Sequence, residues 1–149
     1  MPTVKEIARE RDEVVTVTPD ETAVEVAETM KEENVGSVIV VEDETPVGIV
    51  TDRDLAMQII AGDREANETE TRDVMTRDLV TVDADDEISD LIETLGDAGV
   101  RRMPVVDGGE IAGIVTLDDI VVLLATEHQS ISNEFQSVRS VITSESPPY

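Results

Sequence analysis

Cysteine and tryptophan are absent from this chain of 149 residues, and its aromatic residues amount to one phenylalanine and one tyrosine. Without thiols the protein can form neither a disulfide nor a thiolate metal site. The shortage of aromatic rings argues against nucleic-acid binding that depends on base stacking. It also means that the hydrophobic core must be built from aliphatic side chains and methionine.

Long apolar runs are missing as well. None approaches the ~18 residues that a membrane-spanning helix needs. The first residues, Met1 to Glu6, lack the apolar region of a signal peptide. We therefore expect a cytoplasmic protein with no membrane partner.

Positive charge is scarce, since 11 Lys and Arg residues face 35 Asp and Glu residues and the net charge is −24. A surface of this sign repels nucleic acids and anionic membranes. The acidic residues are scattered along the chain instead of forming a block, which favours a solvated surface over an acidic tail for a basic partner. With Lys5 and Lys31 as the only lysines, the pattern is typical of a protein adapted to high intracellular salt.

Histidine occurs once, as His128, and one histidine provides no metal cluster and no nucleophile–base pair. The Ser, Thr and Asp residues have no His or Lys constellation that would suggest hydrolysis. We therefore expect a non-enzymatic protein with no catalytic residues and no metal site of its own.

The chain repeats itself at an offset of 65 residues (81 − 16), which carries Thr16-Val17 onto Thr81-Val82. The same offset carries Val40-Val41 onto Val105-Val106 and Gly48-Ile49-Val50-Thr51 onto Gly113-Ile114-Val115-Thr116. One register that holds over three separated blocks indicates a duplicated structural unit.

Each copy begins with a short strand and an amphipathic helix. Val14 to Val17 is β-branched, and Thr18-Pro19-Asp20-Glu21 predicts a helix start with Thr18 as N-cap and Pro19 as first helical residue. In the second copy Asp83 is the expected cap. The predicted buried stripes of the two helices are Ala23, Val26, Ala27 and Met30, and Ile88, Leu91, Ile92 and Leu95.

A β-hairpin and a second helix complete each copy. The apolar runs Val38–Val41 and Met103–Val106 predict strands covered on both faces. Return strands at 46–50 and 110–115, helices from Asp52 to about Ala61 and from Leu117 to about Ala125, and a polar linker at 62–71 follow.

The predicted fold class is therefore α/β (α+β): two β-α-β-β-α repeats packed about a pseudo-two-fold axis, because one repeat alone would leave apolar faces open to water. We expect the first repeat at 1–66, the second at 67–125 and a C-terminal segment at 126–149. That segment carries Ile131, Phe135, Val138 and Ile142 near helical spacing. It is either a helix for a dimer or partner, or a loosely ordered tail.

Three segments resemble a known family: Gly48-Ile49-Val50-Thr51-Asp52-Arg53-Asp54, Gly113-Ile114-Val115-Thr116-Leu117-Asp118-Asp119, and Val100-Arg101-Arg102-Met103-Pro104-Val105-Val106-Asp107. Together with the lead-in Asp73-Val74-Met75-Thr76, they are similar to the tandem cystathionine-β-synthase-type (CBS) domain pair, or Bateman module, over residues ~3 to ~125. The resemblance implies a sensor of adenine nucleotides or adenosyl ligands that regulates a fused or separate partner and pairs into homodimers.

The resemblance also implies that the Gly-h-h-Thr-x-x-Asp segments contact the ribose and phosphate of the ligand. Thr51 would lie at the start of a helix, where backbone N–H groups suit an anion. Asp54 could accept hydrogen bonds from two vicinal ribose hydroxyls, and Thr116 and Asp119 repeat the arrangement. The alternative is that both segments are ordinary helix caps.

A phosphate needs local positive charge, which arginine supplies well. The resemblance places Arg101 and Arg102 opposite Thr51 and Asp54 of the other repeat, with Arg53 nearby; the alternative is that they only offset local acidity. At the second site the corresponding cross-repeat positions are Gly36 and Ser37, and Asp118 replaces Arg53. We therefore expect one competent site, centred on Asp54, and one that is weak, empty or adenosine-type.

The adenine is expected in an apolar slot near Thr16, Thr81, Ile49 and Ile114. The residues expected to bind the ligand are Thr16, Ile49, Thr51, Arg53, Asp54, Thr81, Arg101, Arg102, Met103, Pro104, Ile114, Thr116 and Asp119.

The sequence thus predicts a regulatory module that binds AMP, ADP, ATP or an S-adenosylmethionine-like ligand, needs no cofactor and acts on a separate protein partner. Mg²⁺ is expected only as a companion of a polyphosphate, since no ligand cluster for it stands out. The alternative is a ligand-free module that uses the same fold for dimerisation or assembly.

Overall fold

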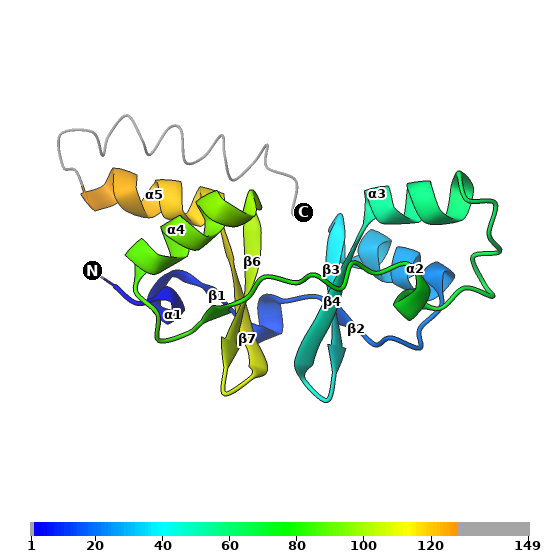
Figure 1. Ribbon diagram of the computed structural model, residues 1–149, viewed down its shortest axis with the longest axis horizontal. Helices are drawn as coiled ribbons and strands as arrows, with labels where there is room; N and C mark the ends of the chain where they lie inside the picture. The colour runs from blue at the N-terminus through cyan, green and yellow to red at the C-terminus, as the bar shows by residue number, and fades with distance from the viewer. Residues whose placement is uncertain (1, 128–149) are drawn as a thin grey trace. The chain divides into compact units, whose positions relative to one another are not determined.

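The computed structural model describes residues 2–127 and divides the chain into two compact units (Figure 1). The first-repeat unit is Val14–Leu79, and the second-repeat unit joins residues 2–13 to residues 80–127. His128 and most of the expected C-terminal segment lie outside the described residues. None of the described helices is long and apolar enough to cross a membrane.

The first-repeat unit is built on a three-stranded sheet in the order β2-β3-β4, in which β2 is parallel and β4 antiparallel to β3. Its strands are β2 (Thr16–Val17), β3 (Ser37–Glu42) and β4 (Thr45–Thr51). Its helical elements are α2 (Ala23–Glu33), α3 (Asp52–Leu55), which continues as the π-helical turn η2 (Ala56–Ile60), and the 3-10 turn η3 (Thr71–Asp73).

The second-repeat unit has a four-stranded sheet in the order β1-β7-β6-β5. Its strands are β1 (Arg9–Glu10), β5 (Val82–Asp83), β6 (Arg102–Asp107) and β7 (Glu110–Thr116). Its helical elements are α1 (Val4–Ile7), the 3-10 turn η1 (Arg11–Glu13), α4 (Ile88–Ala98) and α5 (Leu117–Glu127). Both units are thus mixed α+β, as predicted.

The duplication holds at the level of single backbone pairs. Ser37 lies opposite Thr51 in the first hairpin and Arg102 opposite Thr116 in the second, and all later pairs keep the offset of 65. Even the register shift recurs, between Val40 and Val41 and between Val105 and Val106. The sequence register therefore corresponds to a repeated three-dimensional unit.

Both central helices begin four residues later than the sequence predicts. Thr18 is not the N-cap of the first one: α2 starts after Thr22, whose hydroxyl accepts the N–H of Glu25 at 3.2 Å while the Glu25 carboxylate accepts the N–H of Thr22. This second capping box lies directly after the predicted one.

Both predicted helix starts are turns. The carbonyl of Glu21 accepts both the N–H and the hydroxyl of Thr71, at 2.8 and 2.7 Å. In the second unit the N-cap is Glu87, not Asp83, whose carboxylate accepts the N–H of Asp85 at 2.9 Å in a turn.

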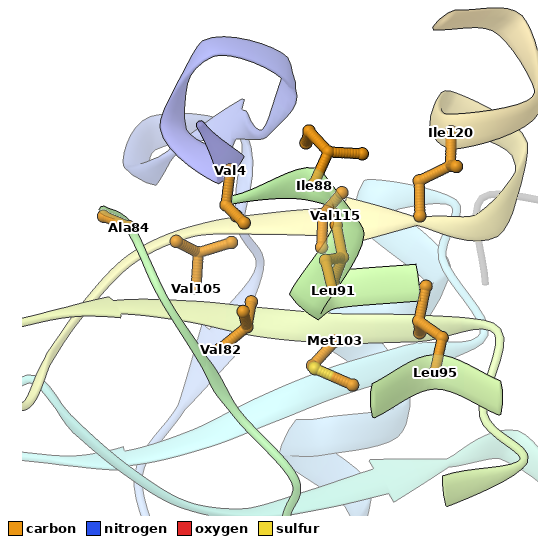
Figure 2. Close-up of a cluster of buried hydrophobic side chains, with 10 residues drawn as sticks. All are labelled: Val4, Val82, Ala84, Ile88, Leu91, Leu95, Met103, Val105, Val115 and Ile120. Atoms are coloured by element: carbon orange, nitrogen blue, oxygen red, sulfur yellow. The ribbon is translucent and has the colours of Figure 1, made fainter. Parts of the chain in front are cut away.

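An aliphatic core fills each unit. In the second-repeat unit ten buried side chains from α1, α4, α5 and the sheet converge, and Figure 2 shows them around Leu91 and Met103. The corresponding cluster of the first unit contains Val26, Met30 and the inner residues of its hairpin. The predicted stripes are too wide by one position, since Ala27 is exposed and Ile92 keeps 39% of its surface exposed.

Each unit is closed by a segment that lies outside the β-α-β-β-α pattern. In the second-repeat unit the N–H groups of Val4 and Lys5 donate to the carbonyls of Asp86 and Ala84 at 2.8 and 3.0 Å. In the first-repeat unit the N–H groups of Thr71 and Arg72 donate to the carbonyls of Glu21 and Pro19, again at 2.8 and 3.0 Å. The closing segments therefore correspond at an offset of 67 (71 − 4). Residues 2–9 complete the second-repeat unit although they stand before β2, the first strand of the first-repeat unit.

The predicted polar linker at 62–71 is in part a packed element. Thr69 is 9% exposed and Thr71 is fully buried, and the carbonyl of Thr69 accepts the N–H of Ala23 at 2.9 Å. The polar composition of this segment suggested an exposed linker. Its threonines can be buried because their hydroxyls donate hydrogen bonds to backbone carbonyls. The domain limits expected from the sequence, and the pseudo-two-fold packing, stay predictions.

A pair of neighbouring residues on α4 tests the core. Leu91→Ala removes a side chain with no exposed surface and should lower the free energy of unfolding by about 2–5 kcal/mol. Ile92→Ala, on the exposed side of the same helix, should lower it by less than about 1 kcal/mol. Denaturant titrations followed by circular dichroism compare the two, and equal losses would contradict this core.

Candidate functional site

The two predicted Thr-x-x-Asp segments lie where β4 and β7 run into helices. Thr51 donates its N–H to Asp54 Oδ2 at 2.9 Å, and its hydroxyl accepts the N–H of Asp54 at 3.1 Å. Thr116 and Asp119 repeat both bonds at 3.3 and 3.1 Å. The helix-capping role considered from the sequence is therefore present in both units.

Capping leaves part of each carboxylate available. Asp54 and Asp119 accept the capping bond through Oδ2, and no hydrogen bond to either Oδ1 forms within residues 2–127. Both carboxylates are partly exposed. Each can therefore cap its helix and still accept hydrogen bonds from a hydroxylated ligand.

The residues predicted to surround the adenine lie on or directly beside strands of the two sheets. In the first-repeat unit Thr16 of β2 and Ile49 of β4 both lie opposite Ile39, so the three form one row across the sheet. In the second-repeat unit Ile114 lies opposite Pro104, and Thr81 is the exposed residue just before β5. Thr16 and Ile49 thus flank Ile39 in one unit, and Ile114 and Pro104 are direct cross-strand neighbours in the other.

The predicted phosphate ligands lie at the start of β6, beside the start of α5. Arg101 Nη2 lies 3.5 Å from Asp118 Oδ1, and its carbonyl accepts the N–H of Leu117 at 2.7 Å. Arg102 lies opposite Thr116 in the hairpin. The expected pairing of both arginines with Asp54 of the other repeat stays a prediction.

Two further predicted residues are not open to a ligand through their side chains. Met103 has no exposed surface and packs in the core of the second-repeat unit, and Pro104 is buried as well (Figure 2 shows Met103). The two side chains point to opposite faces of the sheet, and both are buried because β6 is covered on both faces at this point. Only the backbone of Met103 can take part in binding.

Arg9 is the residue that the sequence analysis missed. It pairs with Ile114 in the β1–β7 ladder, and its Nε lies 3.7 Å from Asp119 Oδ2. Burial, and next the positive charges of Arg9 and Arg101, lower the pKa of the Arg102 guanidinium. At the offset of 67, residues 2–9 share no identical residue with 69–76, so the sequence repeat provided no signal for Arg9.

This arginine changes the charge expected at the second-repeat site. From the sequence we expected little charge there to neutralise a phosphate, because Arg101 and Arg102 were assigned to the other repeat and Arg9 to neither site. In the first-repeat unit the same places hold Gly36, Ser37 and Thr76. Arg53, at the start of α3, is exposed and makes no side-chain hydrogen bond within residues 2–127.

No group of three or more acidic or histidine side chains suited to hold a metal ion occurs within residues 2–127. The polar side chains at the two junctions are threonines and aspartates, joined in the second-repeat unit by arginines.

The sequence model of the CBS domain matches this chain twice, over residues 4–61 and 72–126. The chain belongs to the CBS-domain family. Both matches include a Thr-x-x-Asp segment, so the two candidate sites lie inside the CBS domains. The fold is accordingly that of a CBS-domain pair.

This chain has relatives both among known sequences and among solved structures. An uncharacterized protein of Methanopyrus kandleri is 42% identical over 120 residues, which are 79% of this chain and 60% of that protein. The structure of CBSX2, a CBS-pair protein of Arabidopsis thaliana, in complex with AMP is 26% identical with a TM-score of 0.71 and covers 86% of this chain and 100% of that one.

A second solved relative is the CBS domain pair of protein MJ0100 in complex with 5'-methylthioadenosine and S-adenosyl-L-methionine. It is 25% identical with a TM-score of 0.70, and the match covers 86% of this CBS chain and 99% of that one. The ligands of both solved relatives contain adenosine.

Two glycines allow the closing segments to reach the sheets. A Cβ on Gly113 would collide with the carbonyl oxygen of Arg9, and one on Gly48 would lie 2.9 Å from that of Thr76. Only a residue without a side chain permits such backbone contacts. Gly113 therefore leaves room for the β1–β7 ladder that holds Arg9 beside the site.

Gly113→Ala tests this close approach. The new methyl group should force β1 away from β7 and lower the midpoint of thermal unfolding by several degrees. Gly96→Ala, in the middle of α4 where a Cβ meets nothing within 4 Å, should raise stability by about 0.5–1 kcal/mol. Differential scanning calorimetry measures both, and a neutral Gly113→Ala would show that the contact is dispensable.

Proposed function

We propose that this CBS pair is a regulatory, non-enzymatic module that binds an adenosine-containing ligand and acts on a separate protein partner. The observation that carries the proposal is the pair of equivalent strand-to-helix junctions, each with a threonine and an aspartate joined by two hydrogen bonds. Support comes from the solved relatives, whose ligands are AMP in one and 5'-methylthioadenosine with S-adenosyl-L-methionine in the other.

The chemistry of the junctions suits a nucleoside. The free Oδ1 of Asp54 or Asp119 can accept a ribose hydroxyl in a charge-assisted hydrogen bond. The half-buried apolar residues beside them, Ile49 and Ile114, offer an adenine ring a surface with few polar groups. Ligand binding would favour one arrangement of the CBS pair and so change the surface that the partner reads.

The proposal includes the conditions in which the protein works. A net charge of −24 repels a nucleotide phosphate at low ionic strength, and salt screens this repulsion within about 10 Å at 0.1 M. We place the protein in a salt-rich cytoplasm. Mg²⁺ accompanies the ligand only if the ligand carries a polyphosphate.

A thermal-shift screen with AMP, ADP, ATP with and without Mg²⁺, NAD and S-adenosylmethionine at high salt tests the ligand class. A ligand at 100 times its Kd should stabilise the protein by about 2.7 kcal/mol. If no adenosine-containing compound raises the melting temperature, the proposal fails.

Calorimetric titration of two variants tests the sites. Asp54→Ala and Asp119→Ala should each weaken binding at their own junction, by about tenfold or more, because each removes a charged acceptor. Asp78→Ala, an exposed residue outside both junctions, is the control for the change in net charge. The titration also tests whether the Asp54 site is the single competent one.

A second candidate function is assembly without a ligand, and one surface favours it. An apolar groove of about 480 Å³ lies between α4 and α5 of the second-repeat unit. Ile92, Leu117 and Leu124 on its walls each keep 39% of their surface exposed. Exposed apolar grooves of this kind are typical of protein–protein contacts, and a second copy of the chain is the occupant that we propose.

Ile92→Gln tests the assembly function. If the groove forms a dimer, the variant should sediment as a monomer in analytical ultracentrifugation, because a polar amide replaces an apolar contact. Ile60→Gln, a change at an 81% exposed position of the first-repeat unit, is the matched control and should leave the state unchanged. A dimer that survives Ile92→Gln would exclude this groove as the interface.

A further inference from the structure

The two junctions differ most in the residue that their closing segments place next to them. Arg9 pairs with Ile114 in the second-repeat unit, and Thr76 pairs with Ile49 in the first. Since Ile49 and Ile114 correspond at the offset of 65 (114 − 49), Arg9 and Thr76 occupy the same place in the two folds. One junction therefore has a guanidinium group where the other has a hydroxyl.

The start of the hairpin repeats this contrast. Arg101 and Arg102 precede and begin β6, whereas Gly36 and Ser37 stand in the same places before and in β3. Three of the 11 basic residues of this acidic chain thus gather at one strand end of the second-repeat unit.

Acidic neighbours pair with only two of these three arginines. Arg101 lies 3.5 Å from Asp118, and Arg9 lies 3.7 Å from Asp119. Arg102 is half-buried and has neither an ion pair nor a side-chain hydrogen bond within residues 2–127. A partly buried guanidinium without a partner is costly, and an anion that enters between the three groups would remove that cost.

We propose that Arg9, with Arg101 and Arg102, makes the second-repeat junction selective for ligands that carry a phosphate, and that Thr76 makes the first-repeat junction the site for adenosine-type ligands without one. The inference rests on the proposed function and reverses the sequence-based expectation, which gave the phosphate to the site of Asp54. The helix N-terminus does not account for the difference, because both junctions have one.

A purely structural role for Arg9 explains the geometry less well. Its Nε–Oδ2 separation of 3.7 Å from Asp119 exceeds that of a hydrogen bond, and 48% of its side chain is exposed. Such an ion pair contributes little to stability. Arginine is in contrast well suited to a phosphate, because its planar donors match the phosphate oxygens.

Exchanging the two corresponding residues tests the proposal. In calorimetric titrations at fixed ionic strength, Arg9→Thr should weaken AMP binding by about tenfold and leave adenosine affinity unchanged, because only AMP has the charge that Arg9 meets. Thr76→Arg should strengthen AMP binding at the first-repeat junction. Adding Asp54→Ala to that variant should abolish this gain. Arg64→Thr, an exposed arginine outside both junctions, controls for the loss of one positive charge.

Equal losses for AMP and adenosine in Arg9→Thr, or no loss for either, would overturn the selectivity. A lower melting temperature without ligand would indicate a structural role instead, so thermal unfolding of the free variant is measured as well.

Pyrophosphate provides a readout that does not depend on adenosine. If adenosine compounds fail to bind but pyrophosphate stabilises the wild type and not Arg9→Thr, the arginine site stands and the proposed function falls. If pyrophosphate and AMP both leave the melting temperature unchanged, the arginine site is refuted too.

Discussion

The architecture depends on a close backbone contact at the outer edge of each hairpin. Gly113 admits the carbonyl of Arg9 to the edge of β7, and Gly48 admits that of Thr76 to β4. Each contact satisfies backbone groups that would otherwise remain open at a sheet edge, and it anchors a segment that also covers the start of the central helix. The closing segments are therefore part of each core and not linkers between repeats.

This contact also links fold and charge. A chain with a net charge of −24 repels anions over most of its surface, so an anion site needs positive groups held at a defined place. Backbone pairing supplies that placement, since β1 positions Arg9 by its ladder with β7 and the hairpin positions Arg102 opposite Thr116. The two units repeat the same hairpin pairs and closing contacts, but their electrostatic character differs.

Prediction from the sequence succeeded where signals were local or repeated. The hairpins, the final helices and the register of 65 follow from short apolar runs and turn residues, and the mutual caps of Thr51 with Asp54 follow from their spacing. It failed at the helix starts, because two capping boxes follow one another at Thr18 and Thr22. Thr71, which lies 50 residues away, decides between them. Its hydroxyl donates a hydrogen bond to the carbonyl of Glu21, and the helix begins after Thr22.

The sequence by itself determined the duplication, the hairpin pairing, the CBS family and the Thr-x-x-Asp junctions, because each is written in residues close together or at one constant offset. Only the tertiary structure decided that residues 2–9 complete the second-repeat unit and bring Arg9 to Asp119. The physical reason is that 110 residues separate this pair along the chain (119 − 9). Their proximity arises from a backbone ladder between distant segments, and no local pattern records which two segments will pair.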